Sequence, residues 1–345
     1  MFCAHLALSL HKIGGTSAKI SSKLGFLHSV CTIFAKQKHN FYKPRQTPPK
    51  YMMRQNPFNG LGIALATPFN QDGSINFTQL AELVEFQIEN GTDFICVLGT
   101  TAETPCLTNE EKRAVMDCVV KVNNGRLPLL LGAGGNCTAQ VVDYLKHTDL
   151  TGFAGVLIVA PYYNKPTQEG LFQHFKTVAE NSPLPVVLYN VPGRTGVNIE
   201  ADTTLRLAQT CPNVVAIKEA SGKITQIEAI IENAPEGFEV LSGDDAITFE
   251  LLTIGAKGVI SVVGNAYPKE FGSMIHHTLQ GDYNTALKLH RKFSQAYKLL
   301  SVDGNPAGIK SLLAVTGKAE NILRLPLVPA RKQTYEGLEA FAERM

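Results

Sequence analysis

Eight short runs of β-branched and aliphatic residues recur along the chain from Gly60 onward. Each run is four to six residues long, and successive runs begin about 20–35 residues apart. The runs are Gly62–Thr67, Phe94–Leu98, Pro128–Leu131, Gly155–Val159, Pro185–Tyr189, Val214–Ile217, Phe238–Leu241 and Gly258–Val263. Their length and composition are typical of β-strands that are buried on both faces.

The intervals between these runs carry helical periodicity. Between residues 77 and 88 the apolar positions fall at three- and four-residue steps, and Gly91 follows as a stop signal. Thr108 to Glu111 reads as a capping box ahead of a second apolar stripe. Buried strands that alternate with helices form a parallel sheet, so eight such units predict an α/β fold, a (β/α)8 TIM barrel. A doubly wound open sheet is the alternative, although it usually has fewer strands and a phosphate-binding glycine turn.

The barrel pattern occupies only part of the 345-residue chain. After Gly281 the strand signal ends, and three amphipathic segments follow, at about Tyr283–Leu300, Pro306–Val315 and Thr334–Glu343. We therefore predict three parts. These are an N-terminal leader over residues 1–55, a catalytic barrel over 56–281 and a C-terminal three-helix appendage over 282–345.

The leader is strongly basic. Residues 1–54 contain nine Lys or Arg and no acid, and the first acidic residue is Asp72. An acid-free basic segment of this kind is typical of an organelle transit peptide, whereas Met52 or Met53 is an alternative start of the protein. We expect the leader to be disordered or absent from the mature fold. We expect the protein in the cytoplasm, or in an organelle if the leader is a genuine transit peptide.

Charge and cysteine usage exclude several classes of protein. Beyond the leader, 23 basic residues stand against 30 acidic ones, so this part is a poor electrostatic match for nucleic acid. No apolar stretch approaches the roughly 20 residues that span a bilayer, so we expect no membrane insertion. The seven cysteines show no C-x-x-C spacing. That pattern argues against a disulfide framework or a zinc site and favours a reducing compartment.

The residues that follow the eight runs point to the chemistry, because the active site of a (β/α)8 barrel lies at the carboxyl ends of its strands. They are rich in hydroxyls and include one lysine, several carboxylates and no histidine. This set argues against a histidine-based triad or a His-rich metal site. The sequence also lacks G-x-S-x-G, H-E-x-x-H, G-x-G-x-x-G and P-loop patterns, so we expect neither a metal nor a nucleotide cofactor.

Three side chains near strand ends are candidates for catalysis or binding. Lys218 ends the sixth run, and burial would make its neutral amine available to attack a carbonyl. Tyr189 ends the fifth run, and its phenol suits a proton shuttle. Arg194 follows a Pro-Gly turn and offers a fork of donors to a substrate carboxylate. Each has a structural alternative, namely a paired or solvated lysine, a buried tyrosine with a satisfied hydroxyl, and a solvated surface arginine.

Six motifs taken together resemble one known family. They are GTTAE (99–103), PYYNKPTQEGLFQHF (161–175), YNVPGRTG (189–196), IKEASG (217–222), LSGDD (241–245) and GVISVVGN (258–265). These motifs are similar, in collinear order from about Asn59 to the C-terminus, to those of the pyruvate-dependent class I aldolases typified by 4-hydroxy-tetrahydrodipicolinate synthase. The resemblance implies pyruvate and L-aspartate-4-semialdehyde as substrates, no cofactor, a role in lysine biosynthesis, and a homodimer or homotetramer.

The resemblance also implies catalytic roles for four residues. Lys218 would form an imine with pyruvate. Tyr189 would donate and accept protons during imine formation, and Thr100 and Tyr163 would complete a proton relay with it. In the family, the residue that matches Tyr163 reaches in from the neighbouring subunit of a tight dimer.

Four further residues would bind substrate if the resemblance holds. Thr101 and the backbone of Ile260 would hold the pyruvate carboxylate. Arg194 would receive the carboxylate of the semialdehyde, and Gly243 would line the pocket. The family usually has glycine where this chain has Ala102, a one-methyl departure that we expect to be tolerated.

Related aldolases share the barrel and the lysine but catalyse other reactions. N-acetylneuraminate lyases usually carry Ser-Thr in place of Thr100 and Thr101 and lack the arginine found here as Arg194. The residues present therefore favour the synthase over N-acetylneuraminate lyase, and a lyase of 2-keto-3-deoxy sugar acids stays an alternative. A catalytically inactive binding paralogue would be expected to lose Lys218 or Tyr189, and both are kept.

The resemblance raises the question of feedback by lysine. In regulated members a histidine and a glutamate help to hold lysine at the dimer interface, and the matching positions here are Asn109 and Gln140. Asn136 and Tyr162, which belong to the same site, are kept. Because a neutral amide cannot pair with the ligand's ammonium, we expect weak or no inhibition by submillimolar lysine.

Overall fold

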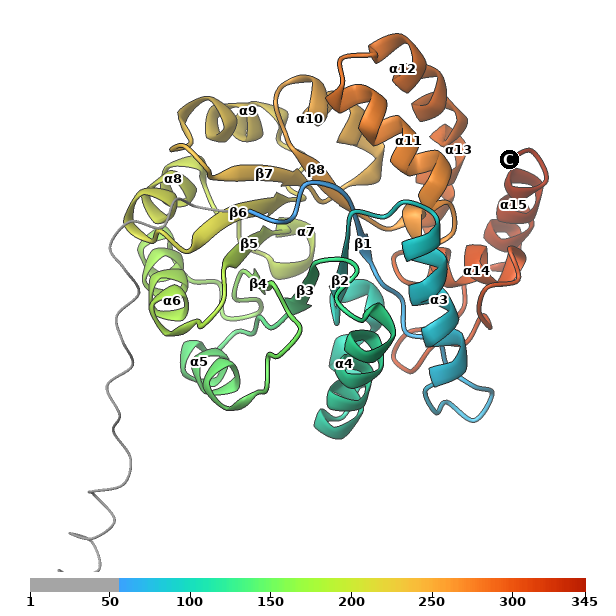
Figure 1. Cartoon of the computed structure of the whole chain (residues 1–345), viewed down its shortest axis with the longest axis horizontal. Coiled ribbons are helices and arrows are strands. Elements are labelled where there is room, and N and C mark those ends of the chain that lie inside the picture. The colour runs from blue at the N-terminus through green and yellow to red at the C-terminus, as the bar shows by residue number, and fades with distance from the viewer. Residues whose placement is uncertain (1–55) are drawn as a thin grey trace, which may run out of the picture. The chain divides into compact units, whose positions relative to one another are not determined.

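The computed structural model describes residues 56–345, which contain a closed barrel of eight parallel strands (Figure 1). The strands follow one another in sequence order, and β1 pairs with both β2 and β8. They are β1 Gly60–Ala64, β2 Phe94–Val97, β3 Leu129–Gly132, β4 Gly155–Val159, β5 Val186–Asn190, β6 Val214–Glu219, β7 Glu239–Ser242 and β8 Gly258–Ser261. Closure confirms the predicted (β/α)8 barrel and rules out the open sheet. The predicted leader, residues 1–55, lies outside the described residues.

Each predicted run overlaps one strand. The observed bounds of β1 and β6 differ from the predicted bounds in ways that affect the packing and the site. β1 begins at Gly60, which pairs with Gly258 of β8. A Cβ on Gly258 would come within 2.4 Å of the Gly60 carbonyl oxygen, so the two strands approach closely only because a glycine stands there. The predicted run begins two residues later, at Gly62. β6 extends through Glu219, so Lys218 lies inside the strand rather than beyond it.

Helices surround the barrel, as Figure 1 shows. They are α3 Phe77–Glu89, α4 Asn109–Asn123, α5 Thr138–His147, α6 Gln168–Asn181, α8 Ala201–Thr210, α9 Ile224–Asn233, α10 Thr248–Thr253 and α11 Pro268–Leu279. Shorter turns of helix follow several strands, namely η2 Thr100–Ala102, η3 Thr104–Cys106, α7 Pro192–Thr195, η4 Asp245–Ile247 and η5 Val263–Asn265. The predicted capping box of α4 is confirmed, because Thr108 and Glu111 each accept a hydrogen bond from the other's backbone N–H.

The C-terminal region forms four helices where the sequence predicted three segments. They are α12 Tyr283–Lys292, α13 Ser294–Val302, α14 Ala307–Val315 and α15 Lys332–Ala342. The first predicted segment breaks at Phe293, whose ring is fully buried against Phe271 and Tyr267. A break of one residue leaves the apolar pattern almost in phase, so periodicity alone does not reveal it. No helix between residues 56 and 345 is both long and apolar enough to cross a bilayer.

The barrel interior is packed with side chains, so it forms a core rather than a pore. The interior cluster consists of Phe58, Ala64, Phe94, Cys96, Leu130, Leu157, Val187, Tyr189, Val191, Val215, Ala216, Leu241 and Ile260. Phe58 and Phe94 meet edge to face with ring centres 5.4 Å apart. Because Phe58 precedes β1 and Phe94 begins β2, these rings fill the amino-terminal end of the barrel and leave the carboxyl end for a site.

Candidate active site

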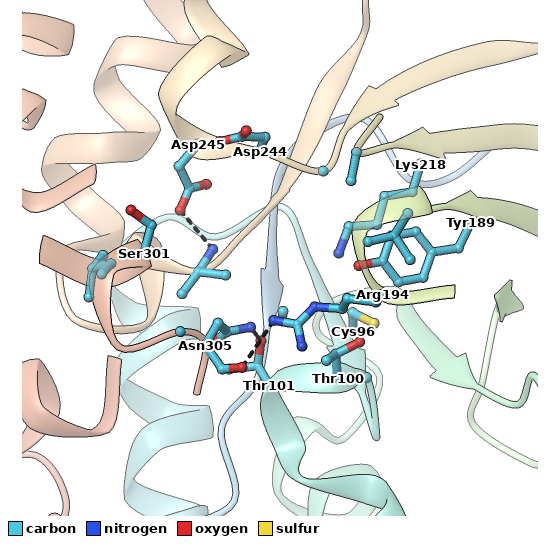
Figure 2. Close-up of a pocket in the computed structure, with 18 of the residues that line it drawn as sticks. Cys96, Thr100, Thr101, Tyr189, Arg194, Lys218, Asp244, Asp245, Ser301 and Asn305 are labelled. Carbon is cyan, nitrogen blue, oxygen red and sulfur yellow. Dashed lines mark hydrogen bonds between the residues drawn. The ribbon is translucent and has the colours of Figure 1, made fainter. Parts of the chain in front are cut away.

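A cavity of about 310 Å³ lies at the carboxyl ends of the strands (Figure 2). Six of the eight predicted site residues line it: Thr100, Thr101, Tyr189, Arg194, Lys218 and Gly243. Polar or reactive side chains that sequence reasoning did not select also line it: Cys96, Asp244, Asp245, Tyr297, Ser301 and Asn305. The cavity therefore joins the predicted barrel rim to residues of the C-terminal helices.

Lys218 and Tyr189 lie side by side on neighbouring strands. They are register partners of β6 and β5, and the Lys218 Nζ lies 4.5 Å from the centre of the Tyr189 ring. Only 6% of Lys218 and 7% of Tyr189 is exposed. The Cys96 thiol shares this cavity, but burial raises its pKa to about 11, so it stays neutral and does not compete as a nucleophile. The arrangement provides one amine and one phenol at the same point of the wall.

The next residue on each of these strands faces away from the cavity and fixes the pair from behind. Asn190 Nδ2 donates to Glu219 Oε1 at 2.8 Å, and Gln226 Nε2 donates to the same oxygen at 3.1 Å. The second Glu219 oxygen accepts from the Ser221 backbone at 3.2 Å. Burial raises the pKa of Glu219, and these donors oppose that shift. Sequence reasoning missed this clamp because the polar residues lie between strand and helix rather than at the rim.

Thr100 and Thr101 lie in the single turn η2, which follows β2. Thr101 is buried, and its Oγ1 accepts a hydrogen bond from Asn305 Nδ2 at 2.9 Å. Arg194 projects from α7 and donates through Nη2 to the Asn305 carbonyl oxygen at 3.0 Å. Asn305 thus connects two predicted binding residues from different loops, as the dashed lines in Figure 2 show.

Asn305 is a functional candidate that the strand-end rule did not find. Its Oδ1 is buried and accepts no hydrogen bond from any group within residues 56–345. A buried polar atom without a partner is costly, and this one belongs to a residue that lines the cavity. The residue precedes α14 and follows no strand, so the rule that selects residues after strands passes over it.

The wall across from Lys218 is acidic. Asp245 accepts backbone hydrogen bonds from Val262 at 2.9 Å and Val263 at 2.7 Å, which fixes the turn after β8. Burial raises the pKa of Asp245 to about 6. Burial and the nearby Asp245 charge also raise the pKa of Tyr297. This wall therefore orders the loop beyond β8, the strand on which a pyruvate-binding backbone was predicted.

Two predicted site residues do not line the cavity of this single chain. The Ile260 side chain is 1% exposed and packs in the barrel interior, which leaves only its backbone for the predicted role. Tyr163 is 89% exposed and adopts a positive φ of 73°. Such a backbone conformation is uncommon for a large side chain, and the exposed ring does not pack on its own barrel.

The model of the dihydrodipicolinate synthetase family matches residues 57–345. The chain belongs to this family. A relative from Phocaeicola vulgatus, named 4-hydroxy-tetrahydrodipicolinate synthase, is 57% identical over 288 residues, which are 84% of this chain and 97% of that protein. The predicted family, the predicted synthase function and the predicted lyase class of enzyme are confirmed.

Solved structures of this family share the fold. Dihydrodipicolinate synthase from Thermotoga maritima is 41% identical, with a TM-score of 0.82, and the alignment covers 84% of this chain and 99% of that one. A further structure, described as the first monomeric dihydrodipicolinate synthase variant, is 41% identical with a TM-score of 0.81 and coverage of 83% and 96%. The family therefore includes a monomeric variant, so membership alone does not fix the number of subunits.

Proposed function

We propose that this enzyme condenses pyruvate with L-aspartate-4-semialdehyde through an imine at Lys218. The observation that carries the proposal is the buried Lys218 amine beside Tyr189 in the cavity at the carboxyl ends of the strands. A neutral amine attacks a carbonyl, and the phenol beside it can carry protons to and from the reacting carbon.

The reaction follows from imine chemistry. The Lys218 amine adds to the keto carbon of pyruvate, and the carbinolamine loses water to give the imine. The imine withdraws electrons, so a methyl proton leaves and an enamine forms. The enamine carbon attacks the aldehyde carbon, and the aldehyde oxygen takes a proton. The substrate's own amino group then attacks the imine carbon, which closes the ring and releases Lys218 to give 4-hydroxy-tetrahydrodipicolinate.

We assign the proton transfers to Tyr189, Thr100 and Tyr163. Positioned general acids and bases contribute roughly 10²–10⁴-fold to rate. Tyr189 and Thr100 line the cavity, and Tyr163, which is exposed in a single chain, would enter the cavity of a second copy as the family resemblance implies. This supports a homodimer or homotetramer as the active form.

Substrate binding is assigned to the surrounding donors. Thr101 and the Ile260 backbone would hold the pyruvate carboxylate, and Arg194 the carboxylate of the semialdehyde. Gly243 lines the pocket, and a Cβ there would come 2.8 Å from Ala220 Cβ and 3.1 Å from Lys218 Cε, so any larger residue would press on the reactive lysine. The unpartnered Asn305 Oδ1 would accept a hydrogen bond from the semialdehyde's ammonium.

We place the enzyme in the cytoplasm, acting on small molecules and binding neither nucleic acid nor membrane. The acidic body and the bacterial source of the relative from Phocaeicola vulgatus support this location. The alternative of organelle import rests only on the leader. The proposed three-part division into leader, barrel (56–281) and C-terminal helices (282–345) stays a prediction.

Borohydride trapping tests the function. The protein is incubated with pyruvate, reduced with borohydride and weighed intact, and we expect a single reduced pyruvate adduct on the peptide that contains Lys218. Lys218→Ala should give no adduct, whereas the exposed Lys223→Ala should be labelled like the parent. An adduct on another lysine contradicts the imine assignment. Product formation with semialdehyde, without cleavage of N-acetylneuraminate, distinguishes the synthase from the lyase.

A further inference from the structure

Glu103 and Lys310 form an ion pair that is cut off from solvent. Lys310 Nζ lies 2.5 Å from Glu103 Oε1, and the side chains are 1% and 0% exposed, respectively. The same ammonium donates to the Ile322 carbonyl oxygen at 2.7 Å and lies 3.9 Å from the centre of the Phe69 ring. Burying two charges is costly, and an apolar pair often stabilises a fold as well. Stability alone therefore does not explain why charges stand here.

Glu103 is attached directly to the turn that carries the predicted relay and binding hydroxyls. It follows Thr100–Ala102 and adopts a φ of 54°, in the left-handed region that side-chain-bearing residues rarely occupy. Its backbone N–H donates to the Thr100 carbonyl oxygen at 3.1 Å, and its Oε2 accepts from the Arg324 backbone at 2.9 Å. A strained residue of this kind persists only where its surroundings fix it.

Lys310 belongs to the helix that follows Asn305, the residue that contacts this turn from the cavity side. It lies on α14, which begins two residues after Asn305. Asn305 donates to the Thr101 hydroxyl, while Lys310 pairs with Glu103. The segment from Asn305 to Lys310 therefore contacts the turn at two points. Asn305 contacts it on the cavity side, and Lys310 contacts it in the buried layer behind the cavity.

We propose that the Glu103–Lys310 pair is a positioning device that holds the Thr100–Thr101 turn in its productive geometry. The inference rests on the roles proposed above for these two threonines. The pair touches no substrate. It fixes the left-handed Glu103, and through it the direction of both hydroxyls, because the three residues share one turn. A displacement of about 1 Å in a catalytic group costs roughly a hundredfold in rate.

The test uses a charge-free pair, so that no buried charge is left alone. In the double variant Glu103→Gln/Lys310→Met, we expect both kcat and the exchange of pyruvate methyl protons with D2O, measured by NMR without semialdehyde, to fall ten- to a hundredfold. The melting temperature should stay near that of the parent. Lys318→Met is the matched control, since this lysine follows α14 and contacts the ring of Phe86 instead. Its exchange rate should equal that of the parent.

Two further variants keep the test decisive. Glu103→Asp retains the charge but retracts the carboxylate by one methylene, and we expect it to slow exchange as well. It takes the place of the double variant in the test if the double variant does not fold. Exchange at the parent rate in either folded variant overturns the positioning role. Thr100→Val separates the two proposals. If Thr100→Val slows exchange and the pair variants do not, only the positioning role fails, whereas unchanged exchange in Thr100→Val overturns the relay itself.

Discussion

Lys218 and Tyr189 are register partners on adjacent strands, and Lys218 Nζ lies 4.5 Å from the centre of the Tyr189 ring. The barrel thus fixes their relation through its backbone ladder rather than through flexible loops. Strands place side chains more reproducibly than loops do, which suits groups that must exchange a proton. Both residues therefore depend on the register of β5 against β6.

Tyr189→Phe should separate ring contact from proton transfer. The ring that faces Lys218 Nζ remains, while the hydroxyl is lost. We expect kcat to fall by roughly 10²–10⁴-fold, because a positioned acid or base contributes that much. Borohydride trapping should still label Lys218, although more slowly. A kcat within about twofold of the parent would contradict the proton-transfer role.

Glu219→Gln should weaken the hydrogen-bonded clamp behind Lys218 and Tyr189, and it should lower both the stability and the activity of the enzyme. Both carboxylate oxygens accept hydrogen bonds, so an amide nitrogen must face a donor of Asn190, Gln226 or Ser221. We expect a loss of about 1–3 kcal/mol in unfolding free energy and a lower kcat. Chemical denaturation and steady-state kinetics measure the two effects. Glu228→Gln, at an exposed position of α9, is the control and should change neither.

Arg194→Ala should affect one substrate more than the other. We expect the KM for the semialdehyde to rise roughly ten- to a hundredfold, because a lost charge-assisted pair costs about 1.5–3 kcal/mol. The KM for pyruvate should change far less. Equal increases for both substrates would instead assign Arg194 a structural role through its bond to Asn305.

His174 should make the fold sensitive to acid. Burial lowers the pKa of His174 from its ordinary value of 6.5 to about 4, while Thr138 Oγ1 lies 2.9 Å from its Nδ1. Between these values the unfolded chain binds a proton that the folded chain does not. Stability is therefore full above pH 6.5 and falls as the pH drops toward 4, by about 3 kcal/mol. Melting curves of His174→Phe should show a flatter acid limb, whereas exposed His147→Gln should keep the parent's slope.

Feedback by lysine should be weak. Asn109 and Gln140 are exposed at the starts of α4 and α5, where regulated relatives are expected to hold the ligand with a histidine and a glutamate. Without the carboxylate, the ligand's ammonium loses its charge partner, and binding should weaken by about tenfold or more. A steady-state titration with lysine measures this. Half-inhibition well below millimolar would refute the prediction, and Gln140→Glu should tighten whatever inhibition exists.

The barrel was predictable because the spacing of apolar residues along the sequence shows which side chains are buried. That spacing differs between strands and helices. The carboxyl-end rule found Lys218, Tyr189 and Arg194 because parallel strands bring their ends together, and the family resemblance added Thr100, Thr101 and Gly243. It could not find Asn305 or Lys310, because neither follows a strand. The break at Phe293 and the clamp at Glu219 were missed for a related reason. Both depend on contacts between distant segments, which no local pattern in the sequence encodes.

Thr101 and Asn305 are 204 residues apart in the sequence, which affects the order in which parts of the active site are synthesised. A growing chain emerges with all eight strands before the groups that hold Thr101 and Glu103 have been synthesised. A nascent or prematurely terminated protein that ends before Asn305 contains every barrel strand, yet it lacks both Asn305 and Lys310, which contact the turn of Thr101 and Glu103. Catalytic competence thus requires the segment that contains Asn305 and Lys310, and closure of the barrel alone does not supply it.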